Sequence, residues 1–168
     1  GDEYLSSPID RRPKFHLYQP NIALISGIAW DHINVFPTYA NYVEQFEIFI
    51  EKITNGGILV YNEDDSEVKR VAEAATNPIR KLAYHTPKYT VNDGVTLLET
   101  PEGAMPIEVF GAHNLNNLAG AKWICQNMGV DEADFYEAIA SFKGASKRLE
   151  KIAEGKGKVA YKDFAHSP

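Results

Sequence analysis

An amide-rich cluster lies near the middle of the chain, where a predicted strand gives way to a predicted helix. It contains His113, Asn114, Asn116 and Asn117, shortly after Gly111. His113 and Asn117 are four residues apart, so they share one face once the helix has begun. An amide carries a donor and an acceptor side by side, which suits the edge of an adenine ring, and the free N–H groups of a first helical turn favour an anion. Taken alone, the cluster favours an elaborate helix cap, because Asn is a good capping residue, and a nucleotide site is the alternative.

Other polar side chains follow the predicted buried strands. Asp31 and His32 come after the apolar run 21–26, and a carboxylate pair at 64–65 comes after the apolar run 57–62. In open α/β sheets, ligands bind beyond the carboxyl ends of the parallel strands. A neutral imidazole at such a place can ligate a metal, whereas a surface loop histidine is the alternative for His32. The carboxylate pair is expected to cap the helix that follows it.

Clustered cations close the last predicted helix, at Lys143, Lys147 and Arg148. Their ordinary role is to offset the carbonyl end of the helix dipole. A phosphate clamp is the alternative, because a guanidinium grips phosphate oxygens with two parallel hydrogen bonds. Glu3 lies in a polar segment at the start of the chain, and its local sequence alone predicts a solvent-facing side chain.

The elements that must position these residues alternate between strand and helix. Short apolar runs predict buried parallel strands, and apolar residues spaced by three or four predict amphipathic helices. The predicted strands are 21–26, 57–62 and 81–84, and the predicted helices are 39–53, 66–75, 114–128 and 132–141. Turn signals within 89–110 predict a small antiparallel unit, and 159–161 is expected to be the first strand of something new. The expected fold class is α/β, with three layers, a mainly parallel sheet, helices on both faces and a small antiparallel unit.

Composition restricts the class of protein. The 168 residues carry a formal net charge of −6 and are 44% hydrophobic, which predicts one domain or one domain with part of another. Acidic and basic residues are mixed without a basic stripe, which argues against a nucleic-acid partner. No apolar run approaches ~20 residues, so no membrane partner is expected. The single Cys125 is expected to be a buried thiol in a reducing compartment, and the protein to be cytoplasmic.

Six short motifs occur in one order along the chain, and together they resemble the ATP-binding central domain of the Mur ligases. They are Gly-Asp-Glu-Tyr at 1–4, Asp-His at 31–32, Asn-x-Asp-Asp at 62–65, Gly-x-His-Asn-x-x-Asn at 111–117, Phe-x-Gly-Ala-x-Lys-Arg-Leu-Glu at 142–150 and Asp-Phe-Ala-His-x-Pro at 163–168. The resemblance implies an ATP- and Mg²⁺-dependent ligase that joins UDP-N-acetylmuramate to an amine through an acyl phosphate.

One segment bears on the amine substrate. The residues Asp-Arg-Arg-Pro-Lys-Phe at 10–15 resemble most the branch of the family that joins UDP-N-acetylmuramate to L-alanyl-γ-D-glutamyl-meso-diaminopimelate in peptidoglycan recycling. The branch that adds L-alanine in peptidoglycan biosynthesis is the alternative. A Rossmann-like nucleotide-binding module without chemistry is the alternative from another class.

The resemblance also implies a role for each candidate residue. Glu3 and His32 would be Mg²⁺ ligands, although an imidazole among oxygen ligands is unusual for this ion. Arg148 would act in catalysis beside them by contacting the ATP phosphates, and His166 would face the substrates. The implied nucleotide-binding residues are His113, Asn114, Asn117, Lys147, Arg148 and Asp163.

The resemblance sets the expected domains as well. Residues 1–150 would be the central ATP-binding domain and residues 151–168 the start of a C-terminal ligase domain. The chain contains no Gly-x-x-Gly-Lys-Ser/Thr phosphate loop, which the family carries before the Glu3 motif. The sequence is therefore expected to be a piece of a larger protein and to be catalytically inactive alone.

Overall fold

A computed structural model of the chain describes residues 2–146, 148 and 150–163. The residues fall into two compact units. The first contains the chain up to His85 together with Ala119–Ile124, and the second contains the remaining residues. No helix among the described residues is both long enough and apolar enough to span a bilayer.

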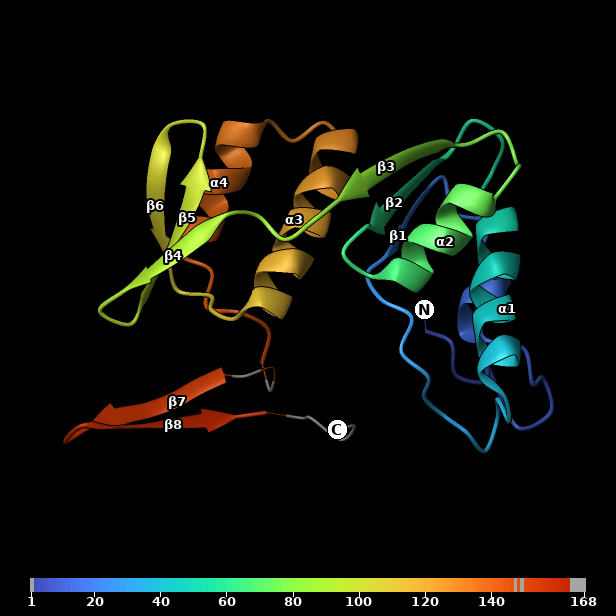
Figure 1. The fold of residues 1–168 in the computed structure, drawn as a ribbon, viewed down its shortest axis with the longest axis horizontal. Coiled ribbons are helices and arrows are strands. Elements are labelled where there is room, and N and C mark those ends of the chain that lie inside the picture. Colours follow the sequence, from blue (N-terminus) through green and yellow to red (C-terminus); the bar gives the residue numbers. More distant parts are fainter. Residues whose placement is uncertain (1, 147, 149, 164–168) are drawn as a thin grey trace. The chain divides into compact units, whose positions relative to one another are not determined.

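The first unit is built on a three-stranded parallel sheet with the order β1-β2-β3. These strands are β1 (Ile22–Ile25), β2 (Ile58–Asn62) and β3 (Arg80–Tyr84). Two helices make the crossovers that parallel pairing requires, namely α1 (Tyr39–Glu51) between β1 and β2, and α2 (Ser66–Ala74) between β2 and β3 (Figure 1). The strand–helix alternation in the sequence therefore produces the expected parallel sheet.

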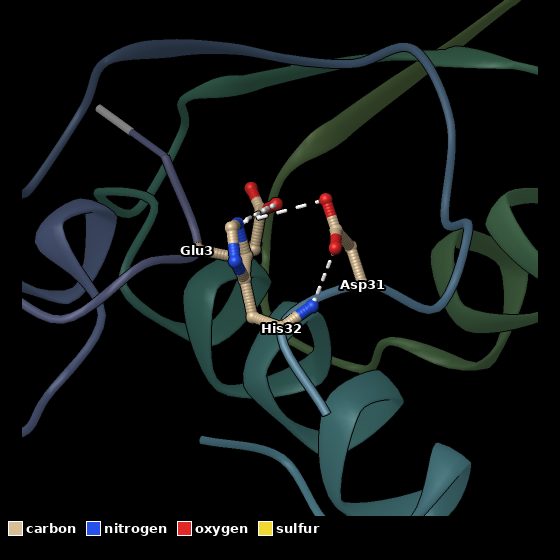
Figure 2. A group of neighbouring side chains, drawn as sticks. All are labelled: Glu3, Asp31 and His32. Atoms are coloured by element: carbon tan, nitrogen blue, oxygen red, sulfur yellow. Dashed lines mark hydrogen bonds and ion pairs between the residues drawn. The ribbon is translucent and has the colours of Figure 1, made fainter. Parts of the chain in front are cut away.

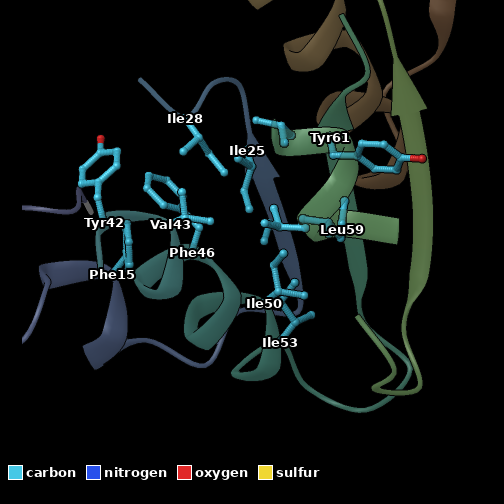
Figure 3. Close-up of a cluster of buried hydrophobic side chains, with 14 of the residues drawn as sticks. Phe15, Ile25, Ile28, Tyr42, Val43, Phe46, Ile50, Ile53, Leu59 and Tyr61 are labelled. Carbon is cyan, nitrogen blue, oxygen red and sulfur yellow. The ribbon is translucent and has the colours of Figure 1, made fainter. Parts of the chain in front are cut away.

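Both faces of this sheet are covered, because alternate residues of the central strand β2 pack into different clusters. Leu59 and Tyr61 join the apolar cluster formed with α1 and α2 (Figure 3). Ile58 and Val60 join a second cluster, in which Trp123 of the 119–124 segment takes part. This arrangement gives the three layers that the sequence predicts.

Helix α1 forms where its sequence offers a cap and an apolar stripe. The Thr38 hydroxyl accepts a hydrogen bond from the backbone N–H of Asn41 at 3.2 Å and so caps the first turn. The buried residues of α1 recur at helical spacing and face the sheet. They are Tyr42, Val43, Phe46 and Ile50. A short 3₁₀ helix, η1 (Lys14–Leu17), packs beside α1.

The second unit begins with an antiparallel sheet of the order β4-β5-β6. Its strands are β4 (Tyr89–Asn92), β5 (Val95–Thr100) and β6 (Gly103–Ile107). The β4–β5 turn is Asp93-Gly94, whose φ angles of 48° and 80° match the tight hairpin turn that an Asp-Gly pair favours. The expected small antiparallel unit is confirmed.

Two helices and a hairpin complete the chain. Helix α3 (Ala112–Asn127) begins two residues before the predicted start, and α4 (Glu132–Ala140) follows it. Strands β7 (Glu150–Gly155) and β8 (Lys158–Lys162) form an antiparallel hairpin. The prediction that 159–161 would be the first strand after α4 is therefore wrong, because β7 precedes it. Almost every residue of β7 is exposed, so it lacks the apolar alternation by which a strand is recognised.

Two expectations of burial need correction. Leu24 of β1 is 36% exposed, because β1 lies at an edge of the sheet order while β2 occupies the centre. Burial on both faces, which the sequence predicts for β1 and β2 alike, holds fully for β2 alone. Cys125 is a free thiol of intermediate exposure rather than a fully buried one.

Candidate functional site

The segment that carries Glu3 is held by backbone hydrogen bonds to the residues before and within η1. The N–H of Lys14 donates to the carbonyl of Tyr4 at 2.9 Å, and the N–H of Phe15 donates to the carbonyl of Asp2 at 3.1 Å. Glu3 therefore lies between two residues whose backbone positions are fixed. The segment 10–15, which the sequence relates to one branch of the family, thus also positions Glu3.

His32 lies in the loop that leaves the carboxyl end of β1. Its φ is 54°, a left-handed conformation that is uncommon for a residue other than glycine. The Asp31 carboxylate accepts a hydrogen bond from the backbone N–H of His32 at 2.6 Å. The carbonyl of His32 accepts hydrogen bonds from the N–H groups of Val35 and Phe36, at 2.7 and 2.9 Å. These bonds hold the backbone of His32 on both sides of its Cα.

Glu3, Asp31 and His32 form a cluster at this edge of the parallel sheet (Figure 2). The Nε2 atom of His32 lies 3.7 Å from Glu3 Oε1 and 3.7 Å from Asp31 Oδ2. The three side chains are between 24% and 39% exposed, so the cluster is partly shielded yet open to solvent. Residues separated by nearly thirty positions in the sequence therefore meet in one place.

Two tyrosines border the cluster. The ring of Tyr4 lies against the His32 imidazole with a centroid distance of 4.5 Å. Tyr42 of α1 is buried, and its phenol lies close enough to Glu3 and Asp31 for their charges to act on it. Burial raises the pKa of the Tyr42 phenol well above its usual value, and the nearby carboxylates of Glu3 and Asp31 raise it further.

The donor set of the cluster fits a hard divalent cation that keeps part of its water shell. Two carboxylates and one imidazole offer ligand atoms that all lie within 4.8 Å of one another. Two direct ligands of Mg²⁺, each at about 2.1 Å, are at most about 4.2 Å apart, and this ion usually retains several waters. The distances of 3.7 Å from His32 Nε2 to the Glu3 and Asp31 oxygens lie within this limit, so the cluster suits a cation held by direct and water-mediated contacts.

The polar residues at and just after the end of β2 hold the neighbouring loops together. The buried Asn62 amide donates to the carbonyl of Ser26 at 2.9 Å, and its Oδ1 accepts from the N–H of Asp64 at 3.0 Å. The Asp65 Oδ1 accepts from the N–H groups of Glu67 and Val68, so Asp65 caps α2 and the predicted capping role is confirmed. Its Oδ2 accepts from the N–H of Ile28 at 3.0 Å, in the loop that leads to Asp31 and His32.

The amide-rich cluster belongs to the second unit, in the first two turns of α3. Gly111, just before the helix, has a φ of 86°, a conformation that glycine adopts without strain. His113 and Asn117 are exposed and share a face of the helix, as expected. Asn114 is partly buried, and its Nδ2 donates to the carbonyl of Phe110 at 2.9 Å. Asn116 is buried and donates to the Thr86 hydroxyl at 3.1 Å.

The remaining candidates lie near the end of the chain. Arg148 is exposed, with its backbone N–H bonded to the carbonyl of Ala145 at 3.1 Å. Asp163 is exposed after β8. Both are placed within the second unit, whereas Glu3 and His32 belong to the first. Lys147 and His166 lie outside the described residues.

Sequence reasoning missed two members of the neighbourhood of Glu3. Asp31 was noted beside His32 but not as a possible metal ligand, and the Asp-His pair after a strand was the available signal. Tyr42 was predicted as a core residue of α1, which its burial confirms. The apolar periodicity of the helix gave no indication that its phenol lies near the Glu3 and Asp31 carboxylates.

Comparison with known sequences points to one family. A model of the Mur ligase middle domain matches residues 5–125. The UDP-N-acetylmuramate–L-alanine ligase of Caldicellulosiruptor bescii is 28% identical over 166 residues, which cover 92% of this chain and 36% of that protein. The UDP-N-acetylmuramate–L-alanyl-γ-D-glutamyl-meso-2,6-diaminoheptandioate ligase of Escherichia coli is 28% identical over 181 residues, which cover 100% of this chain and 38% of that protein. The chain thus spans less than two fifths of the length of these relatives.

Comparison with solved structures agrees on the fold. MurF from Acinetobacter baumannii has a TM-score of 0.74 at 18% identity, with 92% of this chain and 36% of that chain covered. This likeness supports the mixed α/β architecture of parallel sheet, helices and antiparallel strands. The family model extends over well more than half of the 168 residues, and the chain therefore belongs to the Mur ligase middle-domain family.

Proposed function

We propose that this chain is the central ATP-binding domain of a ligase that forms an amide bond between UDP-N-acetylmuramate and an amine. In this proposal residues 1–150 form that domain and residues 151–168 begin a C-terminal domain. The observation that carries the proposal is the meeting of Glu3, Asp31 and His32 at the carboxyl edge of a parallel sheet, where such folds bind their ligands. Family membership supports it independently.

The proposed reaction has two steps. A carboxylate oxygen of the muramoyl group attacks the γ-phosphorus of ATP, and ADP leaves, which gives an acyl phosphate. The amine nitrogen then attacks the acyl carbon, phosphate leaves, and the nitrogen loses a proton. The protein's part in such phosphoryl transfer is positioning and electrostatic stabilisation.

Each candidate residue, within the cluster and outside it, has a part in this proposal. Glu3 and His32, with Asp31 beside them, would hold Mg²⁺, which when bound neutralises charge on the phosphoryl oxygens. Arg148 would add a fixed positive charge at the ATP phosphates. His113, Asn114 and Asn117 would lie around adenine, Asp163 would bind the ribose, and Lys147 and His166 would contact the phosphates and the substrates respectively.

The amine substrate is the finer part of the proposal. The segment 10–15 favours the peptide L-alanyl-γ-D-glutamyl-meso-diaminopimelate, the amine that the name of the E. coli relative specifies. L-Alanine is the second candidate, because it is the amine named for the C. bescii relative and for the relative from Arthrobacter.

The test uses the protein in which this chain stands between its flanking domains. Phosphate release is measured with ATP, Mg²⁺ and UDP-N-acetylmuramate, with either L-alanine or the tripeptide as the amine. Turnover that requires one of these amines and that falls by at least about a hundredfold in Glu3→Ala and His32→Ala is expected. Turnover that is independent of UDP-N-acetylmuramate, or unaffected by both substitutions, would contradict the proposal.

A further inference from the structure

The last residue of β2, Asn62, is a buried amide at the end of an otherwise hydrophobic strand. Its side chain is 8% exposed, and all five residues of β2 are buried. A buried amide costs free energy unless its polar atoms are hydrogen-bonded, whereas an apolar side chain has no such requirement. Burial alone therefore does not explain an amide at this position.

The Asn62 side chain extends the pairing of β2 with β1 by one position. The backbone register of these two strands ends at the pair Ile25 and Tyr61. One residue further along each strand, Asn62 Nδ2 donates to the carbonyl of Ser26 at 2.9 Å. The backbone of Asn62 is still paired with Tyr84 of β3, so the donor that holds Ser26 belongs to the central strand of the sheet.

A second bond holds the same segment two residues later. Asp65 Oδ2 accepts from the N–H of Ile28 at 3.0 Å, and the side chain of Ile28 is buried in the core. Asn62 also shapes the turn that bears Asp65, because its Oδ1 accepts from the N–H of Asp64 at 3.0 Å. The chain leaving β1 is thus tied at two points to the chain leaving β2, and Asn62 takes part in both ties.

The loop that begins at these ties carries two members of the candidate metal cluster. Asp31 and His32 lie three and four residues beyond Ile28. The far side of the loop is bonded to itself, since the Trp30 indole N–H donates to the carbonyl of Phe36 at 3.1 Å. The N–H of Phe36 in turn donates to the carbonyl of His32 at 2.9 Å. A loop bonded within itself transmits a shift at its base to the side chains that it carries.

The other ligand, Glu3, is anchored separately, through the backbone bonds of its neighbours to Lys14 and Phe15. The distance of 3.7 Å between His32 Nε2 and Glu3 Oε1 therefore depends on two segments that must keep a fixed relation (Figure 2). Ligand atoms of a metal site have to be held within about 0.5 Å of the productive geometry. We propose that Asn62 is a positioning residue, whose amide fixes the exit of β1 and so holds His32 beside Glu3 for a divalent cation. This inference rests on the proposed cation-binding role of Glu3 and His32.

The test is Mn²⁺ binding to the chain of residues 1–168, followed through the electron paramagnetic resonance signal of the free ion. Asn62→Ala removes the amide, and Asn62→Leu removes it while keeping a side chain of similar branched shape. Both are measured at a temperature at which circular dichroism shows the variant to be folded. The Kd for Mn²⁺ is expected to rise about tenfold in each, as is usual when a group that orients a metal ligand is lost.

Asn77→Ala is the matched control within the first unit. The Asn77 amide also bonds a backbone carbonyl, with Nδ2 donating to Ile50 at 3.0 Å, but Asn77 precedes β3 and so lies at the opposite end of the sheet from His32. Loss of either amide is expected to lower the thermal midpoint. Binding to a fully folded sample does not depend on its margin of stability, so the Kd of Asn77→Ala is expected to equal that of the wild type. A Kd raised equally in Asn77→Ala would overturn the inference.

A double-mutant cycle identifies the ligand through which Asn62 acts. If Asn62 positions His32, then His32→Ala costs less Mn²⁺ affinity in the Asn62→Ala background than in the wild type. Glu3→Ala is expected to cost nearly the same in both backgrounds, because Glu3 is anchored by another segment. Equal costs of His32→Ala in the two backgrounds would contradict the positioning role.

The two proposals fail in distinguishable ways. If Glu3→Ala and His32→Ala bind Mn²⁺ as the wild type does, or if the wild type binds none, the cation role fails and the inference about Asn62 fails with it. If those two variants lose affinity while Asn62→Ala and Asn62→Leu both match the wild type, the inference alone fails.

Discussion

The side-chain nitrogen of Asn114 is already committed to the carbonyl of Phe110, at 2.9 Å. This bond uses one of the two N–H donors of the amide, so it supports the capping interpretation without excluding the nucleotide interpretation. His113 and Asn117 on the same helix are exposed. The contribution of Asn114 to nucleotide binding is thus open to a direct measurement.

We predict that Asn114→Ala, in the proposed full-length ligase, weakens ATP binding. Lost hydrogen bonds to a buried ring edge amount to about 1–3 kcal/mol, or roughly a tenfold to hundredfold rise in Kd. Calorimetric titration with ATP measures this, and UDP-N-acetylmuramate binding is the internal control. An unchanged Kd together with a lower thermal midpoint would show that Asn114 only ties α3 to Phe110.

His16 of η1 is a second residue whose chemistry depends on its surroundings. The imidazole is buried and its Nε2 bonds the carbonyl of Gln45 at 2.8 Å. Burial lowers the pKa of His16 below its usual value, and the hydrogen bond to Gln45 partly opposes this shift. The nearby positive charges of Lys52 and Arg12 lower the pKa further. The folded state therefore holds His16 in its neutral form.

We predict that this group makes the fold less stable in mild acid. Above about pH 6.5, the pKa of histidine in an unfolded chain, His16 is neutral in both the folded and the unfolded protein, and its contribution to stability is fully present. As the pH falls below that value the unfolded chain takes up a proton before the folded chain does, so stability is lost. Thermal midpoints between pH 7.5 and 5 measure this loss, which is expected to be smaller in His16→Gln. Parallel curves for the two proteins would disprove the role of His16.

At the scale of the elements, long periodic segments were predicted well and weakly patterned ones were not. Helix α1 and strand β2 follow from apolar periodicity alone, because burial of one stripe or of a whole strand leaves a strong signal in the sequence. Strand β7 was not predicted, because Glu150–Gly155 is exposed and lacks an apolar pattern. Its pairing with β8 depends on backbone hydrogen bonds, which leave no signal in the side-chain sequence. Tyr42 was correctly predicted to lie in the core, but its proximity to the Glu3 carboxylate arises from tertiary packing.

Helix α3 approaches β3 closely at Gly120. A Cβ atom there would lie 2.9 Å from Cζ and 3.0 Å from the hydroxyl of Tyr84, and 3.1 Å from Leu24 Cδ1. The Tyr84 hydroxyl is buried without a hydrogen-bond partner among the described residues, and burial raises the pKa of Tyr84 to about 12. The absence of a side chain at position 120 is therefore a packing requirement within the first unit.

We predict that Gly120→Ala destabilises the fold, although alanine is favoured over glycine in a helix by about 1 kcal/mol. Overpacking against Tyr84 is expected to cost up to about 3 kcal/mol, which exceeds this gain. Urea unfolding of the chain measures the change. Ala121→Gly, at the next and exposed position, is the control for helix propensity. Tyr84→Phe is expected to reduce the penalty by removing the hydroxyl oxygen, which is one of the two Tyr84 atoms near the added Cβ. A stabilised Gly120→Ala variant would show that the helix shifts freely.

At the scale of the whole molecule, the chain supplies only part of what the proposed reaction needs. It contains no phosphate-loop lysine, and it spans less than two fifths of its relatives. The order of six motifs was sufficient to predict the family and the fold class, because these depend on sequence pattern. The amine substrate could not be predicted in the same way, since its specificity depends on side chains that meet only in the assembled site.

We predict that residues 1–168 alone fold but do not turn over substrates. Catalysis by positioning requires all reactants to be held together, and the groups that this chain lacks cannot be replaced by those it has. Phosphate release is measured with ATP, Mg²⁺, UDP-N-acetylmuramate and either amine, alongside circular dichroism of the same sample. Turnover above the buffer blank would mean that the active site lies entirely within these residues.

Asp65 has a consequence for how sequence variation at this position should be interpreted. One oxygen of its carboxylate caps α2, and the other holds the N–H of Ile28 at the base of the loop that bears Asp31 and His32. Serine, threonine and asparagine are equally good caps, yet each offers only one acceptor oxygen in place of two. Helix-capping preferences alone would therefore predict that these replacements of Asp65 are harmless. We expect them to lower activity, because the loop that bears Asp31 and His32 would lose its hydrogen bond to Asp65. Tolerance at position 65 is set by a count of acceptor atoms, and a library screened for helix stability alone would not reveal it.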